Sequence, residues 1–209
     1  MREPVSQTLY QYWNEIRAGR LAPKRFEIEP AQIAALLPDT FIVERRDPKS
    51  VSFRLAGTRI CETFGMEFRG VNLLDLVTEE DRITLERQFS VIARQGAVGV
   101  FTFRSENPGG NPVQWEMLAL PLIHLNNDID RFLGSIAFHD HPIWLKHEPL
   151  VRHRLIENDL VWPEGRPHTL IDAAHRQTPF LPFTREARIV RSDRRQFRVY
   201  DGGLTKSGD

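Results

Sequence analysis

The sequence lacks several features that would place it in a familiar class of protein. It contains one cysteine, Cys61, among 209 residues, which excludes an intramolecular disulfide and a zinc site built from two or four cysteines. It has no excess charge of either sign, because 28 Lys and Arg residues balance 28 Asp and Glu residues. Overall charge therefore cannot hold the chain to nucleic acid or anionic lipid, although a local patch could. No internal repeat is visible.

Long hydrophobic runs are absent as well. The longest apolar run, residues 117–123, contains Pro121 and is far shorter than the roughly 20 residues of a membrane-spanning helix. The N-terminus has no apolar core of a secretory signal peptide. With one cysteine and neither a signal nor a membrane span, we expect a cytoplasmic protein.

The residues that are present fit a globular chain, with 41% hydrophobic and 27% charged residues. A first helix is predicted to begin with Ser6 as its N-cap and to end at Gly19. A second, short helix is predicted to open at Pro30 and to stop at Pro38. Residues 1–38 are therefore expected to be N-terminal flanking helices. The apolar side chains of the first helix recur at helical spacing, at Leu9, Tyr12, Trp13 and Ile16.

From residue 40 the hydrophobic period changes to that of strands. Alternation over 41–43 and 51–55 around the turn at 47–50 predicts a hairpin. Short helical turns are expected over 58–76. Thr78 and Asp81 form a capping box that opens a longer helix, which ends near Gly96. Three more strands are predicted, at 98–104, 113–122 and 131–139, and the first two flank a turn at 107–112. Residues 39–145 are therefore expected to form an α+β domain, a five-stranded antiparallel sheet with helices on one face.

The pattern weakens in the C-terminal extension, residues 146–209. Apolar residues over 147–158 predict a helix, and the four prolines within 163–182 indicate a linker. Residues 185–200 hold six arginines against two acidic residues. We expect this extension to be irregular and largely flexible.

The order of elements and the local sequence over 53–140 resemble a PAS domain. With the leading helices and hairpin, residues 6–145 look most like a bacterial family of small stand-alone PAS-type proteins without an output domain. Two positions depart from the family: Ala56-Gly57-Thr58 replaces Asn-x-Ala, and Asp140-His141-Pro142 replaces Asp-Ile-Thr. The resemblance rests on Phe53–Ile60, Phe64-Gly65, Gly70–Val77, Glu80-Asp81-Arg82, Trp115, Leu120–Leu122, Gly134–Ala137 and Asp140.

The resemblance implies a cytoplasmic sensory or regulatory module that is not an enzyme and acts through a protein partner. Asp140 matches the residue that helps couple the sheet to an output helix. PAS-type domains often dimerise through a flanking helix, so Leu9, Tyr12, Trp13 and Ile16 are interface candidates for a homodimer. A small apolar ligand would lie between sheet and helices, although a dry aromatic core explains the same residues. The candidate pocket residues are Phe64, Met66, Phe89, Phe101, Phe103, Trp115, Met117 and Phe138.

No cofactor, metal or catalytic site is predicted. The Asn-Cys-Arg-Phe-like motif of flavin-binding PAS domains is missing, and residues 79–96 contain no histidine for haem. His139 and His141 alternate at a strand end, with Asp140, His147 and His153 as further ligand candidates, but two ligands do not make a metal site. No Gly-x-Ser-x-Gly elbow exists. Three rivals remain: a ligand-free interaction adaptor, an enzyme built on these histidines, and a nucleic-acid binder using the arginine-rich tail.

Overall fold

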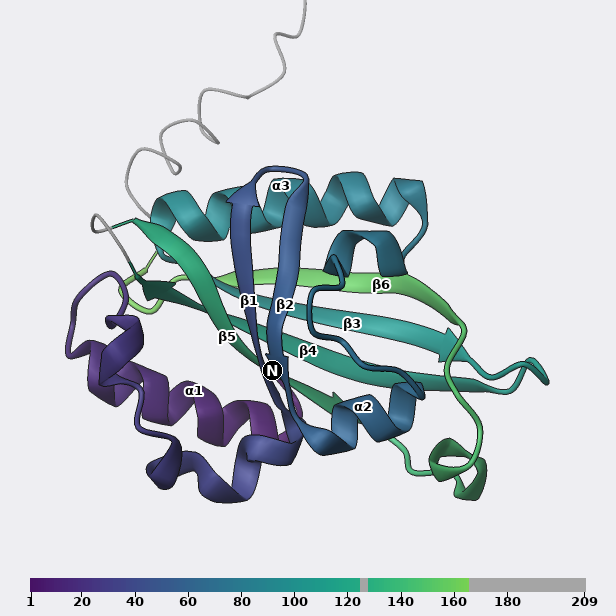
Figure 1. Ribbon diagram of the computed structural model, residues 1–209. Coiled ribbons are helices and arrows are strands. Elements are labelled where there is room, and N and C mark those ends of the chain that lie inside the picture. The colour runs from purple at the N-terminus through teal and green to yellow at the C-terminus, as the bar shows by residue number, and fades with distance from the viewer. Residues whose placement is uncertain (125–127, 166–209) are drawn as a thin grey trace, which may run out of the picture. The chain divides into compact units, whose positions relative to one another are not determined.

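The computed structural model describes residues 1–124 and 128–165 of the chain, and its main feature is one antiparallel sheet in the strand order β2-β1-β5-β4-β3-β6 (Figure 1). The expectations for 166–209, including the linker and the arginine-rich segment, lie outside the described residues. The helices are α1 (Pro4–Arg17), η1 (Arg25–Glu27), η2 (Pro30–Asp39), α2 (Thr58–Phe64), η3 (Leu73–Leu76), α3 (Glu79–Gln95) and η4 (Ile143–Lys146), where η marks a 3-10 helix. The strands are β1 (Thr40–Asp47), β2 (Ser50–Ala56), β3 (Val98–Glu106), β4 (Pro112–Ile123), β5 (Ile129–Phe138) and β6 (Arg152–Val161).

The sixth strand corrects the sequence analysis, which predicts five strands and a helix over 147–158. Strand β6 pairs with β3 from Val98↔Val161 to Glu106↔Arg152. The sheet therefore takes in residues beyond 145, which the sequence analysis assigns to the extension. Asp81, at the start of α3, ties this strand to the helix layer, because its Oδ2 accepts the Leu155 backbone N–H at 3.1 Å.

Turn and cap signals account for the other boundaries. The turn at 107–112 joins β3 to β4 as predicted, and Asn107 Oδ1 accepts the Asn111 N–H at 2.7 Å. Helix α3 follows its cap Thr78 and ends at Gly96, whose left-handed φ of 62° favours glycine. Helix α1 begins at Pro4 rather than after Ser6. The Ser6 hydroxyl instead lies 3.1 Å from that of Ser135 on the sheet.

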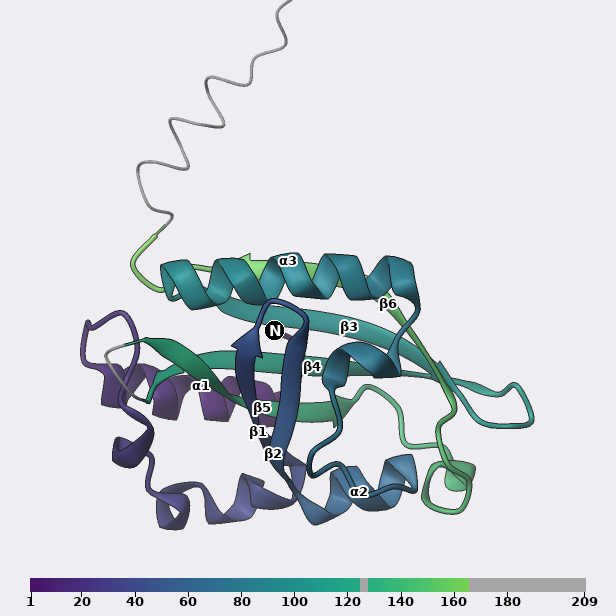
Figure 2. The same ribbon diagram turned by 45° about the horizontal axis from the view of Figure 1, so that its top comes forward.

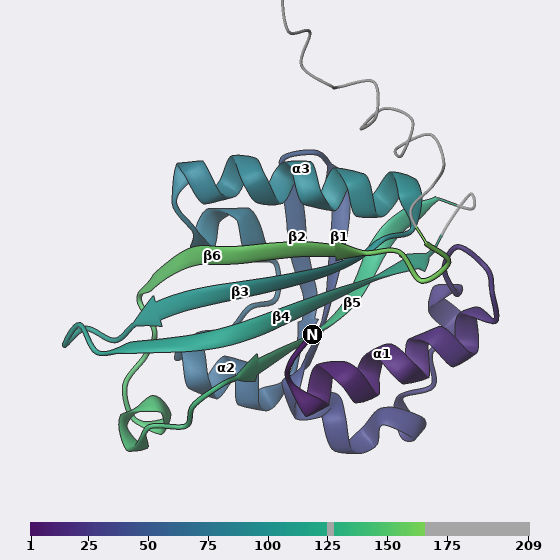
Figure 3. The ribbon, with the colours of Figure 1, turned by 180° about the vertical axis from the view of Figure 1, so that it is seen from behind.

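The helices cover both faces of the sheet. Helices α2 and α3 lie on one face, where α3 runs along the side of β3 and β6 (Figure 2). Phe64 of α2 meets Trp115 edge-on at 5.4 Å, and Phe89 of α3 meets Phe132 at 5.1 Å. Helix α1 packs on the opposite face against β4 and β5, as the view from behind shows (Figure 3).

Helix α1 packs on its own sheet, which corrects the prediction that its stripe is an interface. Leu9 and Trp13 are fully buried and Tyr12 is buried, while Ile16 is partly buried. The Trp13 indole N–H donates to the Pro121 carbonyl at 2.8 Å. Because the chain itself covers the stripe, the argument for a homodimer through these residues falls away. No helix in the described part of the chain is long and apolar enough to cross a membrane.

Candidate functional site

The eight predicted pocket residues come together, but they pack against one another. Phe103 and Trp115 stack at 4.3 Å, and Phe89 and Phe101 stack at 5.9 Å. Phe64 meets Trp115 from the α2 side. Seven of the eight are buried, and Met66 is partly buried. Rings in these arrangements form a packed aromatic layer between the sheet and the helices.

A buried polar chain crosses this aromatic layer. The Trp115 indole N–H donates to Ser105 Oγ at 2.7 Å, and Ser105 Oγ lies 2.8 Å from His153 Nδ1. Burial lowers the pKa of His153 to about 4, so the ring is neutral at pH 7. The Ser105 hydroxyl can therefore donate to Nδ1, which leaves the ring hydrogen on Nε2. The sequence analysis considers His153 only as a metal ligand, whereas it closes the core from β6, 5.3 Å from the Phe64 ring.

A surface pocket of about 970 Å³ lies where β5 ends, and we call it the β5-end pocket. Of the predicted pocket residues, Phe138 lines it. The remaining apolar lining includes Val5, Ile136 and Leu145, which come from α1, β5 and η4. Two ion pairs stand at its rim, Asp39 with Arg59 and Glu3 with His139.

Beside this pocket, β5 extends past its last pair with β1. Pairing with β1 stops at Thr40↔Ser135, while β5 continues to Phe138. His139 N–H donates to the Gln114 carbonyl on the β4 side. Because backbone groups alternate between the two edges of a strand, Ile136 and Phe138 direct their N–H and C=O groups away from β4. Beyond the last pair with β1, Phe138 has no strand on that side of β5 in the described part of the chain.

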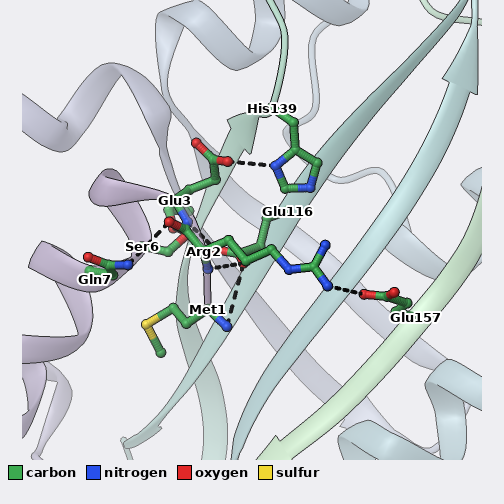
Figure 4. Close-up of polar contacts among 9 residues, drawn as sticks. Met1, Arg2, Glu3, Ser6, Gln7, Glu116, His139 and Glu157 are labelled. Carbon is green, nitrogen blue, oxygen red and sulfur yellow. Dashed lines mark hydrogen bonds and ion pairs between the residues drawn. The ribbon is translucent and has the colours of Figure 1, made fainter.

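One wall of the β5-end pocket is the N-terminal segment, which a buried carboxylate holds on the sheet (Figure 4). Glu116 of β4 is 1% exposed. Its carboxylate accepts the backbone N–H of Arg2 at 2.7 Å and that of Glu3 at 3.4 Å. Glu3 Oε1 lies 2.5 Å from His139 Nδ1, and Arg2 pairs with Glu157 of β6 at 3.2 Å. We call this set of contacts the N-terminal anchor.

Sequence reasoning missed the role of Glu116. It places this residue within the strand predicted at 113–122 and assigns it no function. The available signal was a single acidic side chain inside an otherwise apolar run, because a charge is rarely buried without partners. Backbone N–H groups from the far end of the chain supply those partners.

The histidine cluster gives no metal centre in the described residues. No group of three or more His, Cys, Asp or Glu side chains there could hold a metal ion. His139 is paired with Glu3, while His141 is exposed. Asp140 is exposed and has no hydrogen bond or ion pair with any residue that the structure describes. Its coupling role therefore stays a prediction.

The chain is similar to a known protein family and to several solved structures. Residues 1–137 match the sequence profile of a family described as PAS domain. A LOV protein from Rhodobacter sphaeroides is similar at 15% identity and a TM-score of 0.41, over 56% of this chain and 71% of that one. A PAS domain of an HTR-like protein from Haloarcula marismortui is similar at 21% identity and a TM-score of 0.36, over 55% of this chain and 94% of that one. No curated protein matches the chain.

The family assignment rests on the profile match, which spans more than half of the chain. The matched residues include Phe64, Trp115 and the α3 helix, and they end at Ala137, one residue before the end of β5. Strand β6 lies beyond them. The chain belongs to the PAS domain family.

Proposed function

We propose that this PAS domain is a cytoplasmic sensory or regulatory binding module that binds a small ligand in the β5-end pocket and acts through a protein partner. One observation carries the proposal. The pocket shares Phe138 with the aromatic layer and shares Glu3 and His139 with the N-terminal anchor. An occupant there would touch both the core and the segment that leads into α1.

The lining indicates the chemistry of the ligand. Val5, Ile136, Phe138 and Leu145 offer an apolar surface to an aliphatic or aromatic body. The backbone groups of Phe138, which lie beyond the last pair with β1, offer hydrogen bonds to a polar end. A volume of about 970 Å³ lies within the usual range for a pocket that binds a small molecule. We therefore propose a small amphiphilic ligand.

Binding would act by shifting a conformational population. A ligand whose polar group pairs with His139 would compete with Glu3 for the imidazole, and it would thereby favour states in which the N-terminal segment is released. Helix α1 follows this segment directly, so its docking on β4 and β5 would weaken. A protein partner could read that change.

We expect no flavin or haem in this module. Cys61 lies on α2, with its Sγ 3.9 Å from Glu67 Oε1, and the α3 helix contains no histidine. The purified protein should therefore be colourless. Flavin absorption, or a Soret band, in proportion to the protein would contradict this part of the proposal.

The test is a ligand screen by protein NMR with a pocket-filling variant. Val5→Trp places an indole in the β5-end pocket, and Val151→Trp is its control, because Val151 is 50% exposed and does not line this pocket. Amphiphilic compounds should shift the resonances of Ile136 and Phe138 in the wild type and in V151W but not in V5W. Binding that V5W leaves intact would contradict the proposal.

The ligand-free adaptor is the second candidate, and the packed aromatic layer favours it. The stacked rings of Phe103 and Trp115 need no ligand to complete the core. A screen without any binder, together with a protein partner captured by the same domain, would favour this alternative. Nucleic-acid binding through residues 185–200 concerns a segment outside the described residues and is not part of the proposal.

A further inference from the structure

A second pocket, of about 390 Å³, lies on the sheet face that α1 covers, on the β1 side. We call it the basic pocket. Ile42 of β1 is opposite Leu133 of β5, and Leu133 shares its face with Ser135, the contact of α1. Helix α1 packs on β4 and β5 and leaves this part of the sheet accessible. The basic pocket is lined by Arg25, Ile42, Arg54, Leu55, His124 and Arg131.

A β-bulge brings one of these arginines to the pocket. Ile42 pairs with Leu55 while Val43 pairs with Phe53, so Arg54 is the extra residue of β2. Its Nε lies 3.3 Å from Glu44 Oε2. In a regular strand only every second side chain lies on a given face of the sheet. The bulge thus adds Arg54 to the face that carries the basic pocket.

Several guanidinium groups converge on the Glu44 carboxylate. Arg131 lies across the strand pair from Glu44, with 2.7 Å between Nη1 and Oε1. Arg46 reaches the same carboxylate at 3.5 Å, and Arg54 is the third. Burial alone would raise the pKa of Glu44, but the three arginines hold it below its ordinary value, so the carboxylate is ionised.

Positive charge is left over after these pairs are counted. Asp130 is the second acidic group, 3.7 Å from Arg131 Nη1 and 3.5 Å from His124 Nδ1. The guanidinium of Arg25 forms no ion pair or hydrogen bond with the residues that the structure describes. This region therefore has a net positive charge, because only two carboxylates stand against four arginines, Arg25, Arg46, Arg54 and Arg131. The chain as a whole has no net charge.

Apolar surface adjoins this charge. Leu55 is 50% exposed beside the partly buried Ile42, and Phe26, which follows Arg25, is 77% exposed. Arginine and aromatic residues are enriched where protein interfaces derive most of their binding energy. A volume of about 390 Å³ suits one or two side chains of a partner rather than a large cofactor.

We propose that the basic pocket docks an acidic segment of a partner protein, with a carboxylate among Arg25, Arg54 and Arg131 and an apolar side chain on Leu55. The proposal rests on the proposed function in one respect, that the module acts through a protein. Charge complementarity selects the partner, and the two resident carboxylates disfavour a polyanion that would place several phosphates here.

Peptide selection from a random dodecapeptide display library on the full chain is the first test. We expect enriched peptides to contain acidic residues together with an apolar residue. Arg25→Glu with Arg54→Glu should abolish this enrichment. Arg87→Glu with Arg104→Glu changes the net charge equally at exposed positions on α3 and β3, and it should preserve the enrichment. Enrichment of peptides without acidic residues would overturn the proposal.

Affinities of a selected peptide, measured by fluorescence anisotropy, make the test quantitative. The R25E/R54E variant should bind about tenfold or more weakly, since truncating close charge pairs at an interface has effects of this order. The R87E/R104E control should bind almost as the wild type does. Leu55→Ser should weaken binding, whereas Ile83→Ser, at a residue 51% exposed on α3, should not. Equal losses in both double variants would overturn the proposal.

Two further arms separate the alternatives. In the first arm, inorganic phosphate, a short single-stranded RNA and a free acidic peptide compete with the bound peptide. If phosphate or RNA displaces it at a lower concentration than the acidic peptide does, the pocket is a phosphate site and the proposal is overturned. The V5W variant should bind the selected peptide like the wild type, because Val5 lines the other pocket. If no small ligand is found for the β5-end pocket while peptide binding persists, the ligand proposal fails and the docking proposal stands.

Discussion

Acidification should weaken the fold through one buried imidazole, His153. In the folded state the pKa of this ring is about 4, whereas its ordinary value is 6.5. Between these values the unfolded chain binds more protons than the folded chain, so the free energy of unfolding falls as the pH falls. Linkage for one such group gives a loss of about 2 kcal/mol between about pH 7 and 5, and a total of about 3 kcal/mol at lower pH.

The physical reason lies in the contacts of the ring. A proton on Nδ1 would take away the acceptor of the Ser105 hydroxyl, and it would place a charge 5.3 Å from the Phe64 ring in a water-poor layer. His153→Phe keeps an aromatic ring at this position but removes the titration. Its stability should therefore decline less between these pH values than that of the wild type.

Urea unfolding at a series of pH values measures this difference. The stability gap between wild type and His153→Phe should change by about 2 kcal/mol from about pH 7 to 5 in favour of the variant. His141→Phe serves as the control, because His141 is exposed, and it should decline with pH as the wild type does. Parallel curves for the wild type and His153→Phe would refute the reasoning.

Three substitutions test other parts of the fold. Glu116→Ala should lower the free energy of unfolding by about 2–4 kcal/mol, because two backbone N–H groups lose their acceptor. Amide exchange in α1 should also accelerate, and unchanged exchange there would contradict the role of the N-terminal anchor. Gly134→Ala should cost about 3 kcal/mol in urea unfolding, because a Cβ would lie 2.2 Å from the Phe41 ring, whereas Gly109→Ala should be nearly neutral. Asp81→Ala should lower the free energy of unfolding by about 1–3 kcal/mol and make the Leu155 amide exchange faster. An amide that stays protected would show that the hydrogen bond from Asp81 is not needed to hold β6.

The sequence predicts the five-stranded part of the sheet because its signals are local. The turn at 107–112 and the cap at Thr78 depend on residues a few positions apart, and each is confirmed. Alternation on the hairpin likewise reflects one buried face. These features supported the PAS resemblance, which the family match also confirms.

Strand β6 escaped prediction because it is an edge strand with little apolar burial. Most residues of β6 are exposed, and His153 is its buried residue. In addition, the apolar residues over 147–158 have a spacing that is typical of a helix. The site escaped for a different reason. The contacts of Glu116, Ser105 and Arg54 join residues far apart in sequence or depend on a bulge, and no local pattern encodes either. The aromatic residues were correctly placed in the interior, but sequence cannot say whether rings leave a cavity or fill it.

The docking of α1 constrains the order in which a nascent chain can fold. Trp13 donates to the Pro121 carbonyl, 108 residues later, and Ser6 meets Ser135 across 129 residues. At about 5–20 residues per second, the ribosome needs about 5–25 s to make those partners, even before they leave the exit tunnel. For that time Leu9 and Trp13 have no sheet to cover them. Helix α1 must therefore dock late, and a factor that shields short apolar segments near the ribosome would raise the yield of this protein.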